Sequence, residues 1–456
     1  MPRTITYFST NLKSEKVSFK EALLKGLAPD KGLYLPESIP ELSMEEIISF
    51  SKMTYYEIAF LIAKKFIHAE IPEPILKTIV KDAYNFDVPI EHVYNRNYIM
   101  RLDQGPTASF KDFAARFMGR LMQYFLKLEN KKVLILTATS GDTGSAIANA
   151  FYGLDNIHVV ILFPEKEVTD RQRKQMTTLH KNIQVLALDA KFDDCQALVK
   201  KAFADQDLDY LDLSSANSIN IGRLLPQSMY YCYAYSRLAK KTGEPIIFSV
   251  PSGNFGDLMG GLIAKRMGLP VKKFIISTNE NDEVPVYFTE GFYKTIVPSR
   301  DCISSAMNVG HPSNMARIIS LYGGIMDENG IISKPPDVLA MKKDMFAVSI
   351  SDKETKETIK NIYSRHQLLL EPHGAVGWAG LQHYYKDNPA DDHANQLSVT
   401  LETAHPAKFY KEINDILKID PVLPVSLEGL EKKEEKMEKM KNSYISFKEF
   451  LIKNYK

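Results

Sequence analysis

Short apolar runs alternate with amphipathic segments through the middle of the chain. Runs at residues 133–137, 158–163 and 183–188 have the length of strands, and helical spacing follows at residues 145–152 and 170–179. A continuous apolar run is typical of a strand buried on both faces of a sheet. The alternation therefore predicts βαβ units on a parallel sheet, which is the pattern of an α/β protein.

Two further apolar runs, at residues 246–250 and 397–401, predict strands nearer the C-terminus. Before about residue 97 the pattern differs, because apolar residues recur at helical spacing over residues 43–66 and 74–84. This part of the chain is predicted to be mostly helical. Residues 428–441 mix Glu and Lys densely, which predicts a solvated helix with charge pairs.

Composition narrows the range of functions. The 456 residues carry a net charge of +1, so no overall field favours nucleic acid or an anionic membrane. The cysteines Cys195, Cys232 and Cys302 lack metal-binding spacing and indicate buried thiols in a reducing compartment. The N-terminus lacks the apolar segment of a signal peptide, and no apolar run approaches about 18 residues. We therefore expect a cytoplasmic protein without nucleic-acid, membrane or metal partners.

A single lysine, Lys111, follows a Gly-Pro-Thr turn and lies between two aromatic residues. Helical spacing begins directly after it, and Thr107 or Ser109 can cap that helix. The helix dipole and desolvation both disfavour the ammonium form, so we expect the pKa of Lys111 to be lowered. A neutral amine can form a Schiff base with a carbonyl compound. The structural alternative is an exposed lysine near a helix start.

Three polar turns are candidate anion sites: residues 140–144 and 253–257 each follow a predicted strand, and residues 214–223 form a loop that leads into a helix. Ligands of parallel sheets bind at strand ends, and amides of glycine-rich turns at helix N-termini suit anions. In the second turn, Arg223 can supply a bidentate fork. A carboxylate such as Asp257 is unexpected beside an anion, so we expect it to cap the following helix and point away. Ordinary capping turns are the alternative interpretation; neither a dinucleotide fingerprint nor a Walker loop is present.

Two elements near the C-terminus add candidate groups. His373 stands beside Pro and Gly, where a histidine is either an acid or base or, more often, structural. The strand at 397–401 leads to the sequence Glu-Thr-Ala-His-Pro-Ala-Lys at residues 402–408.

Four elements, taken in their order along the chain, resemble the threonine synthase family. They are the Gly-Pro-Thr turn with Lys111, the Ser-Gly-Asp-Thr-Gly turn, the Gly-Asn-Phe-Gly-Asp turn and the Thr-Ala-His-Pro-Ala-Lys element. These are pyridoxal-phosphate enzymes of the tryptophan-synthase-β fold group. The segment at residues 26–36 is similar to the family's opening domain, and the resemblance covers residues 19–409.

The resemblance implies a fold-type-II enzyme with two open parallel-sheet lobes, one large and one small, and an additional mostly helical N-terminal domain. The implied division assigns residues 1–98 to the N-terminal domain and 129–221 to the small domain. Residues 99–128 and 222–456 form the large, cofactor-binding domain.

The resemblance also implies roles for residues. Lys111 is expected to be the catalytic lysine that bonds to pyridoxal 5'-phosphate, and Thr403 to meet the pyridine nitrogen. The implied contacts of the cofactor phosphate are Gly253, Asn254, Phe255, Gly256 and Asp257. Substrate contacts are implied for Ser140, Gly141, Asp142, Thr143, Asn217, Ser218, Asn220 and Arg223. Asp142 stands where many relatives of the fold group carry Asn near the cofactor's phenolic oxygen.

The implied reaction converts O-phospho-L-homoserine and water to L-threonine and phosphate, by γ-elimination and then β-hydration. Released phosphate near Arg223 is the candidate second base. A phospholyase that releases 2-oxobutyrate would carry the same motifs. A non-catalytic metabolite-binding protein is the second alternative, although it would need neither Lys111 nor Thr403. An ATP-dependent kinase lacks its motifs here. We expect a monomer or homodimer.

Overall fold

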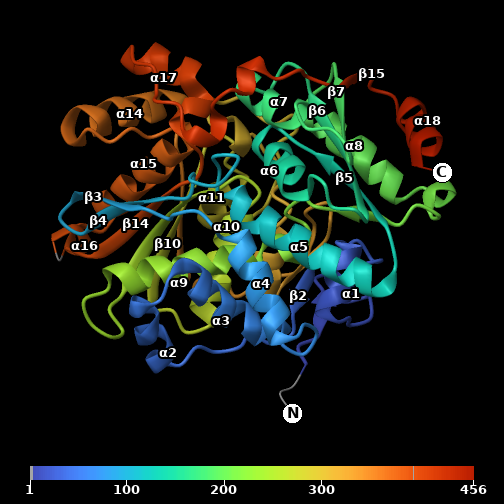
Figure 1. The fold of residues 1–456 in the computed structure, drawn as a ribbon. Helices are drawn as coiled ribbons and strands as arrows, with labels where there is room; N and C mark the ends of the chain where they lie inside the picture. The colour runs from blue at the N-terminus through green and yellow to red at the C-terminus, as the bar shows by residue number, and fades with distance from the viewer. Residues whose placement is uncertain (1–3, 394, 456) are drawn as a thin grey trace.

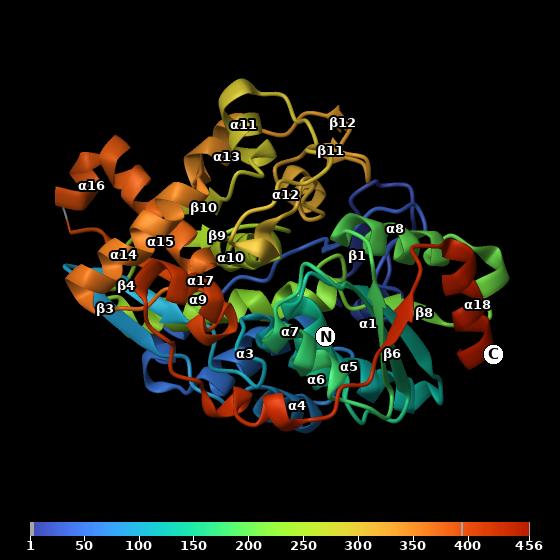
Figure 2. The same cartoon turned by 90° about the horizontal axis from the view of Figure 1, so that it is seen from above.

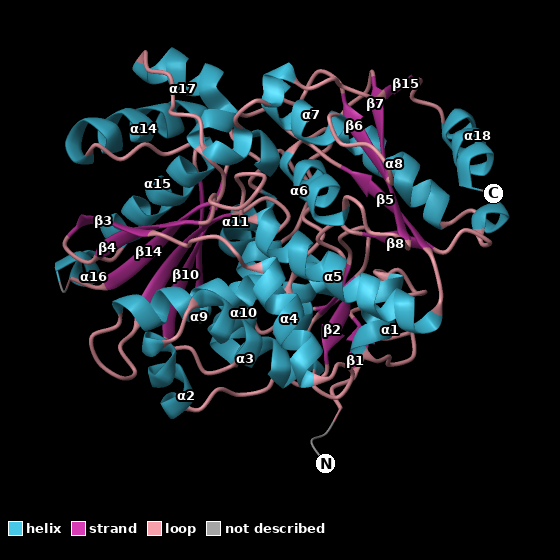
Figure 3. Cartoon of the chain, in the orientation of Figure 1, coloured by secondary structure: helices cyan, strands magenta, loops and turns pink. Residues whose placement is uncertain are grey.

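The computed structural model describes residues 4–393 and 395–455. Its strands form two main groups, which Figure 3 shows in magenta on opposite sides of a helical centre. The larger sheet has six strands in the order β13-β10-β9-β14-β4-β3, all parallel except that β3 runs antiparallel to β4. These strands are Met345–Ser349, Val271–Thr278, Ile246–Pro251, Leu397–Glu402, Asn97–Arg101 and Ile90–Tyr94.

The smaller sheet has five parallel strands in the order β15-β7-β6-β5-β8. They are Glu438–Met440, Ile183–Leu188, Ile157–Pro164, Val133–Ala138 and Leu213–Ser215. The predicted strands of the βαβ pattern therefore exist, and the predicted fold class is confirmed. The helices of this lobe are α6 (Asp142–Phe151), α7 (Asp170–Thr177), α8 (Phe192–Phe203) and α18 (Tyr444–Tyr455).

The N-terminal part is mostly helical, as predicted, and lies along one side of the molecule (Figure 1, blue). Its elements are β1 (Tyr7–Ser9), α1 (Phe19–Lys25), β2 (Tyr34–Pro36), α2 (Met44–Ser49), α3 (Tyr55–Ile67) and α4 (Glu73–Ala83). The helical pattern over residues 43–66 forms two helices rather than one. Ser43 and Thr54 each open a helix with a capping box, so the chain breaks between them.

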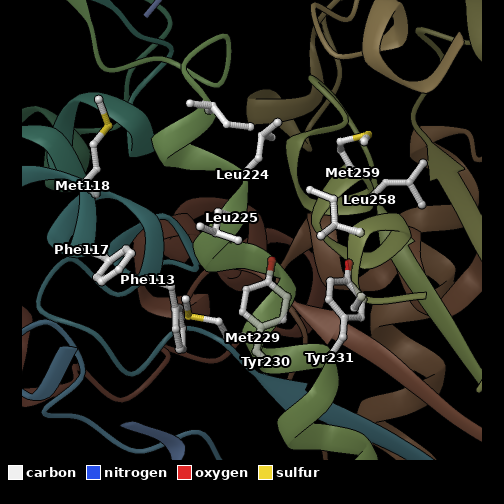
Figure 4. Packing of buried hydrophobic residues seen from close by; sticks show 14 of the residues in the cluster. Phe113, Phe117, Met118, Leu224, Leu225, Met229, Tyr230, Tyr231, Leu258 and Met259 are labelled. Carbon is white, nitrogen blue, oxygen red and sulfur yellow. The ribbon is translucent and has the colours of Figure 1, made fainter. Parts of the chain in front are cut away.

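Helix α5 (Lys111–Glu129) lies between the lobes and packs against both α6 and α9 (Leu225–Leu238). Figure 4 shows the core where α5, α9 and α10 (Gly256–Arg266) meet. Phe113 packs there against Tyr230, with ring centroids 5.5 Å apart. The apolar face of α5 thus fixes the start of the helix against the large lobe.

The remaining helices belong to the large lobe. Figure 2 shows that α11 to α13, with the short strands β11 and β12, gather on one side of this lobe. The elements are α11 (Glu283–Glu290), α12 (Met315–Leu321), β11 (Ile325–Met326), β12 (Ile332–Lys334), α13 (Val338–Asp344), α14 (Asp352–His366), α15 (Pro372–Asp387), α16 (Pro389–His393) and α17 (Tyr410–Leu417). No helix among the described residues is long and apolar enough to span a membrane.

The predicted helix at residues 428–441 is wrong. A short 3-10 turn (Leu430–Lys432) is followed by β15, which adds to the edge of the smaller sheet beside β7. The charges in this segment pair across the fold instead of along a helix: Glu435 contacts Arg173 at 2.9 Å, and Lys439 contacts Glu165 at 2.6 Å. We therefore propose to add residues 438–455 to the predicted small domain.

Candidate active site

Helix α5 begins at Lys111, which therefore lies in the first turn as predicted. The predicted capping by Thr107 or Ser109 is wrong, because the cap residue is Phe110 and no side chain caps the helix. Instead, Asp112 reaches back from the first turn. Its Oδ2 accepts from the Thr107 amide at 2.8 Å, and its Oδ1 accepts from the Thr107 hydroxyl at 2.7 Å. These bonds close the turn and fix the direction in which Lys111 leaves it.

The Lys111 amine lies in an environment that favours its neutral form. Burial lowers its pKa to about 8, and the charges of Lys408 and Arg223 act in the same direction. The Asp142 carboxylate opposes this shift, since its Oδ2 lies 4.0 Å from Lys111 Nζ. The ring of Phe110 covers the amine, with its centroid 5.1 Å from Nζ. The direction of the shift is the one that the sequence predicts.

One pocket collects most of the predicted site residues. Its lining includes Lys111, Ser140, Asp142, Thr143, Asn217, Ser218, Arg223, Gly253, Asn254, Phe255, Gly256, Asp257 and Thr403. These residues come from both lobes and from the start of α5, so the strand-end turns converge as expected for parallel sheets. Gly141 and Asn220 do not line the pocket.

Asn220 is held inside the protein. Its Nδ2 donates to the carbonyls of Leu23 and Ser215, at 2.8 and 2.9 Å, and its Oδ1 accepts from the Gly222 amide at 2.9 Å. Because these contacts engage both ends of its amide, Asn220 does not join the other predicted substrate contacts in the pocket wall. The side chain instead shapes the loop that precedes Arg223.

Gly141 contributes backbone only. It stands at the N-cap of α6 with φ 128°, and a Cβ there would lie 2.5 Å from Gln172 Cδ. Glycine is therefore required by conformation and by space. The residue allows Gln172 to approach the turn that carries Asp142.

Asp142 carries a charge that is shared between two lysines. Its Oδ1 lies 2.6 Å from Lys408 Nζ and accepts from Gln172 Nε2 at 2.8 Å, while its Oδ2 faces Lys111. Burial alone would raise the pKa of this carboxyl, but Lys408 and Lys111 hold the pKa well below its usual range. Asp142 is therefore a buried carboxylate in the pocket wall.

Asp257 does not cap α10. The cap residue is Phe255, with φ 60°, and the Asp257 carboxylate bonds to tyrosines of α9. Its Oδ1 accepts from the hydroxyls of Tyr230 and Tyr231, the latter at 2.8 Å. Burial raises the pKa of Asp257 to about 6, and the two hydroxyls oppose this rise. The tyrosines thus hold the carboxylate toward α9, while its Oδ2 has no hydrogen-bond partner among the residues that the structure describes.

Arg223 is a buried cation with an unused donor. Its guanidinium donates from Nη1 to the Ala216 carbonyl at 2.6 Å, and its Nε has no partner among the described residues. Burial lowers its pKa to about 10, and Asp112 opposes this shift. A buried, incompletely paired guanidinium is costly, so its position in the pocket wall favours an anionic ligand.

His373 lines the pocket, but both ring nitrogens are engaged. Nδ1 lies 2.5 Å from Glu371 Oε2, and Nε2 accepts from the Ala306 amide at 3.0 Å. These bonds assign the proton to Nδ1. The ring thereby ties the start of α15 to the loop at Ala306, which supports the structural interpretation of this histidine.

Several lining residues have no sequence pattern that indicates a site. They are Gln227, Phe192, Ala306 and Met307. Gln227 lies inside α9, and its Oε1 has no hydrogen-bond partner within the described part of the chain, but a single glutamine within a helix carries no motif. Only the packing of α9 against α10 brings it to the pocket.

The pocket fits a cofactor that has an aldehyde and a phosphate. The turn at Gly253 leads into α10, whose first amides have no partner within the helix and suit an anion. A Cβ at Gly253 would lie 2.9 Å from Met307 Cα, so the cradle admits only glycine there. The Lys111 amine and the Thr403 hydroxyl line the same pocket. Together they provide the donor set for pyridoxal phosphate.

These features define a pyridoxal-phosphate-dependent enzyme of fold type II, and comparisons with known proteins agree. The family model described as pyridoxal-phosphate dependent enzyme matches residues 88–397. Models described as threonine synthase N terminus and threonine synthase, C-terminal match residues 6–84 and 374–451. The chain belongs to the threonine synthase family.

Individual relatives extend over nearly the whole chain. The threonine synthase of Haemophilus influenzae is 40% identical over 443 residues, covering 96% of this chain and 98% of its own. The threonine synthase of Escherichia coli is 40% identical over 420 residues, or 91% and 92% of the two chains.

Solved structures agree with these matches. The crystal structure of pyridoxal-phosphate-bound threonine synthase from Brucella melitensis has a TM-score of 0.89 at 33% identity, covering 98% of this chain and 99% of its own. The Escherichia coli structure has a TM-score of 0.87 at 36% identity, with the same coverage.

Proposed function

We propose that the chain is a threonine synthase that converts O-phospho-L-homoserine and water to L-threonine and phosphate. One observation carries the proposal: the pocket combines a partly buried amine at Lys111 with two groups suited to anions. These are the N-terminal turn of α10 and the guanidinium of Arg223. A cofactor phosphate and a substrate phosphate would each find a positive partner.

Each residue has a proposed task. When bound, pyridoxal phosphate supplies an electron sink for the substrate carbanion. Lys111 would hold the cofactor by its aldehyde, and the Lys111 amine would take the proton from the substrate Cα. The Thr403 hydroxyl meets the pyridine nitrogen, and because it is neutral it does not enforce ring protonation. Gly253 to Asp257 contact the cofactor phosphate.

The substrate is proposed to bind between two turns. Ser140 and Thr143 face its carboxylate, Asp142 faces the cofactor ring, and Asn217, Ser218 and Arg223 hold its phosphate. A proton is lost from Cβ as phosphate leaves from Cγ, and Cγ must gain a proton before water adds at Cβ. Because one amine cannot serve every one of these transfers, a second base is needed. The released phosphate, retained at Arg223, would accept the proton from water as hydroxide adds at Cβ.

Product analysis tests this proposal. The purified protein is incubated with O-phospho-L-homoserine, and threonine, 2-oxobutyrate and phosphate are quantified. We expect threonine and phosphate in equal amounts, with no turnover by the Lys111→Ala variant. Release of 2-oxobutyrate in place of threonine would identify a phospholyase, and absence of any product would support a binding protein. The proposal includes a cytoplasmic location and a monomer or homodimer.

A further inference from the structure

Lys408 is a second buried lysine beside the pocket. It lies in the 3-10 turn Pro406–Phe409, and its side chain is fully buried. Its Nζ lies 2.6 Å from Asp142 Oδ1 and donates to the Thr107 carbonyl at 2.8 Å. One ammonium group therefore joins the turn before α5 to the start of α6.

The Asp142 carboxylate lies between the side chains of two lysines. Its Oδ1 is engaged by Lys408, whereas its Oδ2 faces Lys111 at the longer distance of 4.0 Å. The shorter contact is a charge-assisted hydrogen bond, and the longer one is beyond hydrogen-bond reach. Asp142 is thus held primarily by Lys408.

We propose that Lys408 is a positioning residue, which holds and neutralises Asp142 so that Lys111 keeps a neutral amine available for the cofactor aldehyde. This inference rests on the proposed role of Lys111. Without Lys408, the buried Asp142 carboxylate would have Lys111 as its remaining cationic partner. Opposite charges in a poorly solvated pocket stabilise each other, so Lys111 would be retained as ammonium.

The effect of Lys408 on Lys111 depends on the other charged groups around Lys111. The titratable groups that act on Lys111 or line its pocket are Asp142, Lys408, Arg223, Glu371, Asp257 and His373. Asp257 is bonded to two tyrosines, and His373 is bonded to Glu371. Asp142 is the carboxylate that forms an ion pair with Lys111, and Lys408 is the cation that contacts Asp142 most closely.

The test measures the protonation of the Lys111 amine and not the rate of catalysis. Full-length protein freed of cofactor is mixed with pyridoxal 5'-phosphate between pH 6 and 10, and the adduct is trapped with borohydride. Mass spectrometry then gives the initial rate of modification at Lys111. We expect a wild-type midpoint near the pKa of about 8. Lys408→Met should raise this midpoint by about one pH unit or more. Lys408→Arg should restore most of the wild-type profile.

Matched controls separate electrostatics from folding. Lys411→Met removes an exposed lysine three residues away, which pairs with Asp170, and should leave the midpoint unchanged. If Lys408→Met does not fold, Lys408→Gln replaces it, because the amide can still donate to the Thr107 carbonyl. In an Asp142→Asn background the same substitution should move the midpoint less, because no carboxylate remains for Lys408 to neutralise.

Each outcome supports or overturns a stated role. An unchanged midpoint in Lys408→Met, or a shift of the same size with and without the Asp142 carboxylate, would overturn the role of Lys408. Lack of any adduct at Lys111 in the wild type would instead contradict the proposed function. A purely structural Lys408 would alter the free energy of unfolding without moving the midpoint.

Discussion

Lys111 and Asp142 face each other at 4.0 Å, measured from Nζ to Oδ2. The separation allows attraction between the charges without a direct hydrogen bond. The amine is therefore oriented but not locked as ammonium, and burial keeps its pKa at about 8. A lysine so placed can alternate between a bond to the cofactor and proton transfer.

Arg223→Ala is expected to impair use of the phosphorylated substrate more than binding of the cofactor. Loss of a hydrogen bond from a charged donor should lower kcat/KM for O-phospho-L-homoserine by about 10- to 100-fold. The exposed Arg300 provides the control Arg300→Ala, which should retain activity. Steady-state kinetics and cofactor absorbance are measured together. Unchanged turnover with intact absorbance would show that Arg223 has been misassigned.

Thr403→Val is expected to lower kcat by about tenfold or more, because the proposed partner of the pyridine nitrogen is removed. Thr403→Ser keeps the hydroxyl and should retain most of the activity. The comparison requires kcat and the cofactor spectrum of both variants. Equal kcat in the Val and Ser variants would argue against a contact with the ring nitrogen.

Asp257→Asn tests the raised carboxyl pKa. In the folded protein this pKa is about 6, above the ordinary value of 3.8. The contribution of Asp257 to stability is therefore full below about pH 4 and is lost as pH rises through about 6. The Asn variant, neutral throughout, should gain up to about 3 kcal/mol in unfolding free energy at pH 7, and nothing at pH 4.

Urea unfolding of the cofactor-free protein at the two pH values measures this difference. A gain that is the same at pH 4 and pH 7 would show that ionisation of Asp257 is not its cause.

Gly374→Ala is expected to destabilise the protein by about 3 kcal/mol or more through a steric clash. A Cβ at this position would lie 1.5 Å from Glu402 Oε2, within the network that positions His373. In the same helix, a Cβ at Gly377 would be 3.1 Å from Thr400 Cγ2. Gly377→Ala should therefore cost less than about 1 kcal/mol. Denaturant unfolding compares the pair, and equal losses would contradict the clash.

The regular part of the fold is predictable because its signals are local. Apolar runs specify the buried strands β5, β6, β7, β9 and β14, and strand-end turns must meet at one edge of each sheet. Strand β15 is different: only three residues long and rich in charge, it becomes a strand because β7 offers an open edge. Such a pairing depends on a distant partner, which the local pattern does not contain.

The functional site also has features that the local sequence pattern does not predict. Asn220 and Arg223 share one polar loop, but only Arg223 lines the pocket. Their side-chain directions are set by tertiary contacts that residue type does not report. Lys408 contacts the carbonyl of Thr107, 301 residues earlier in the chain. The sequence shows the lysine, but its ion pair with Asp142 depends on how the two lobes pack together.

The central claim is that Lys111 holds the cofactor, and the attachment site tests it most directly. The purified protein is reduced with borohydride, digested and mapped by mass spectrometry, with Lys111→Ala as the control. We predict one phosphopyridoxyl group on Lys111 in the wild-type protein and none in the variant. An adduct on Lys408 or another lysine, or a protein that takes up no added pyridoxal 5'-phosphate, would contradict the claim.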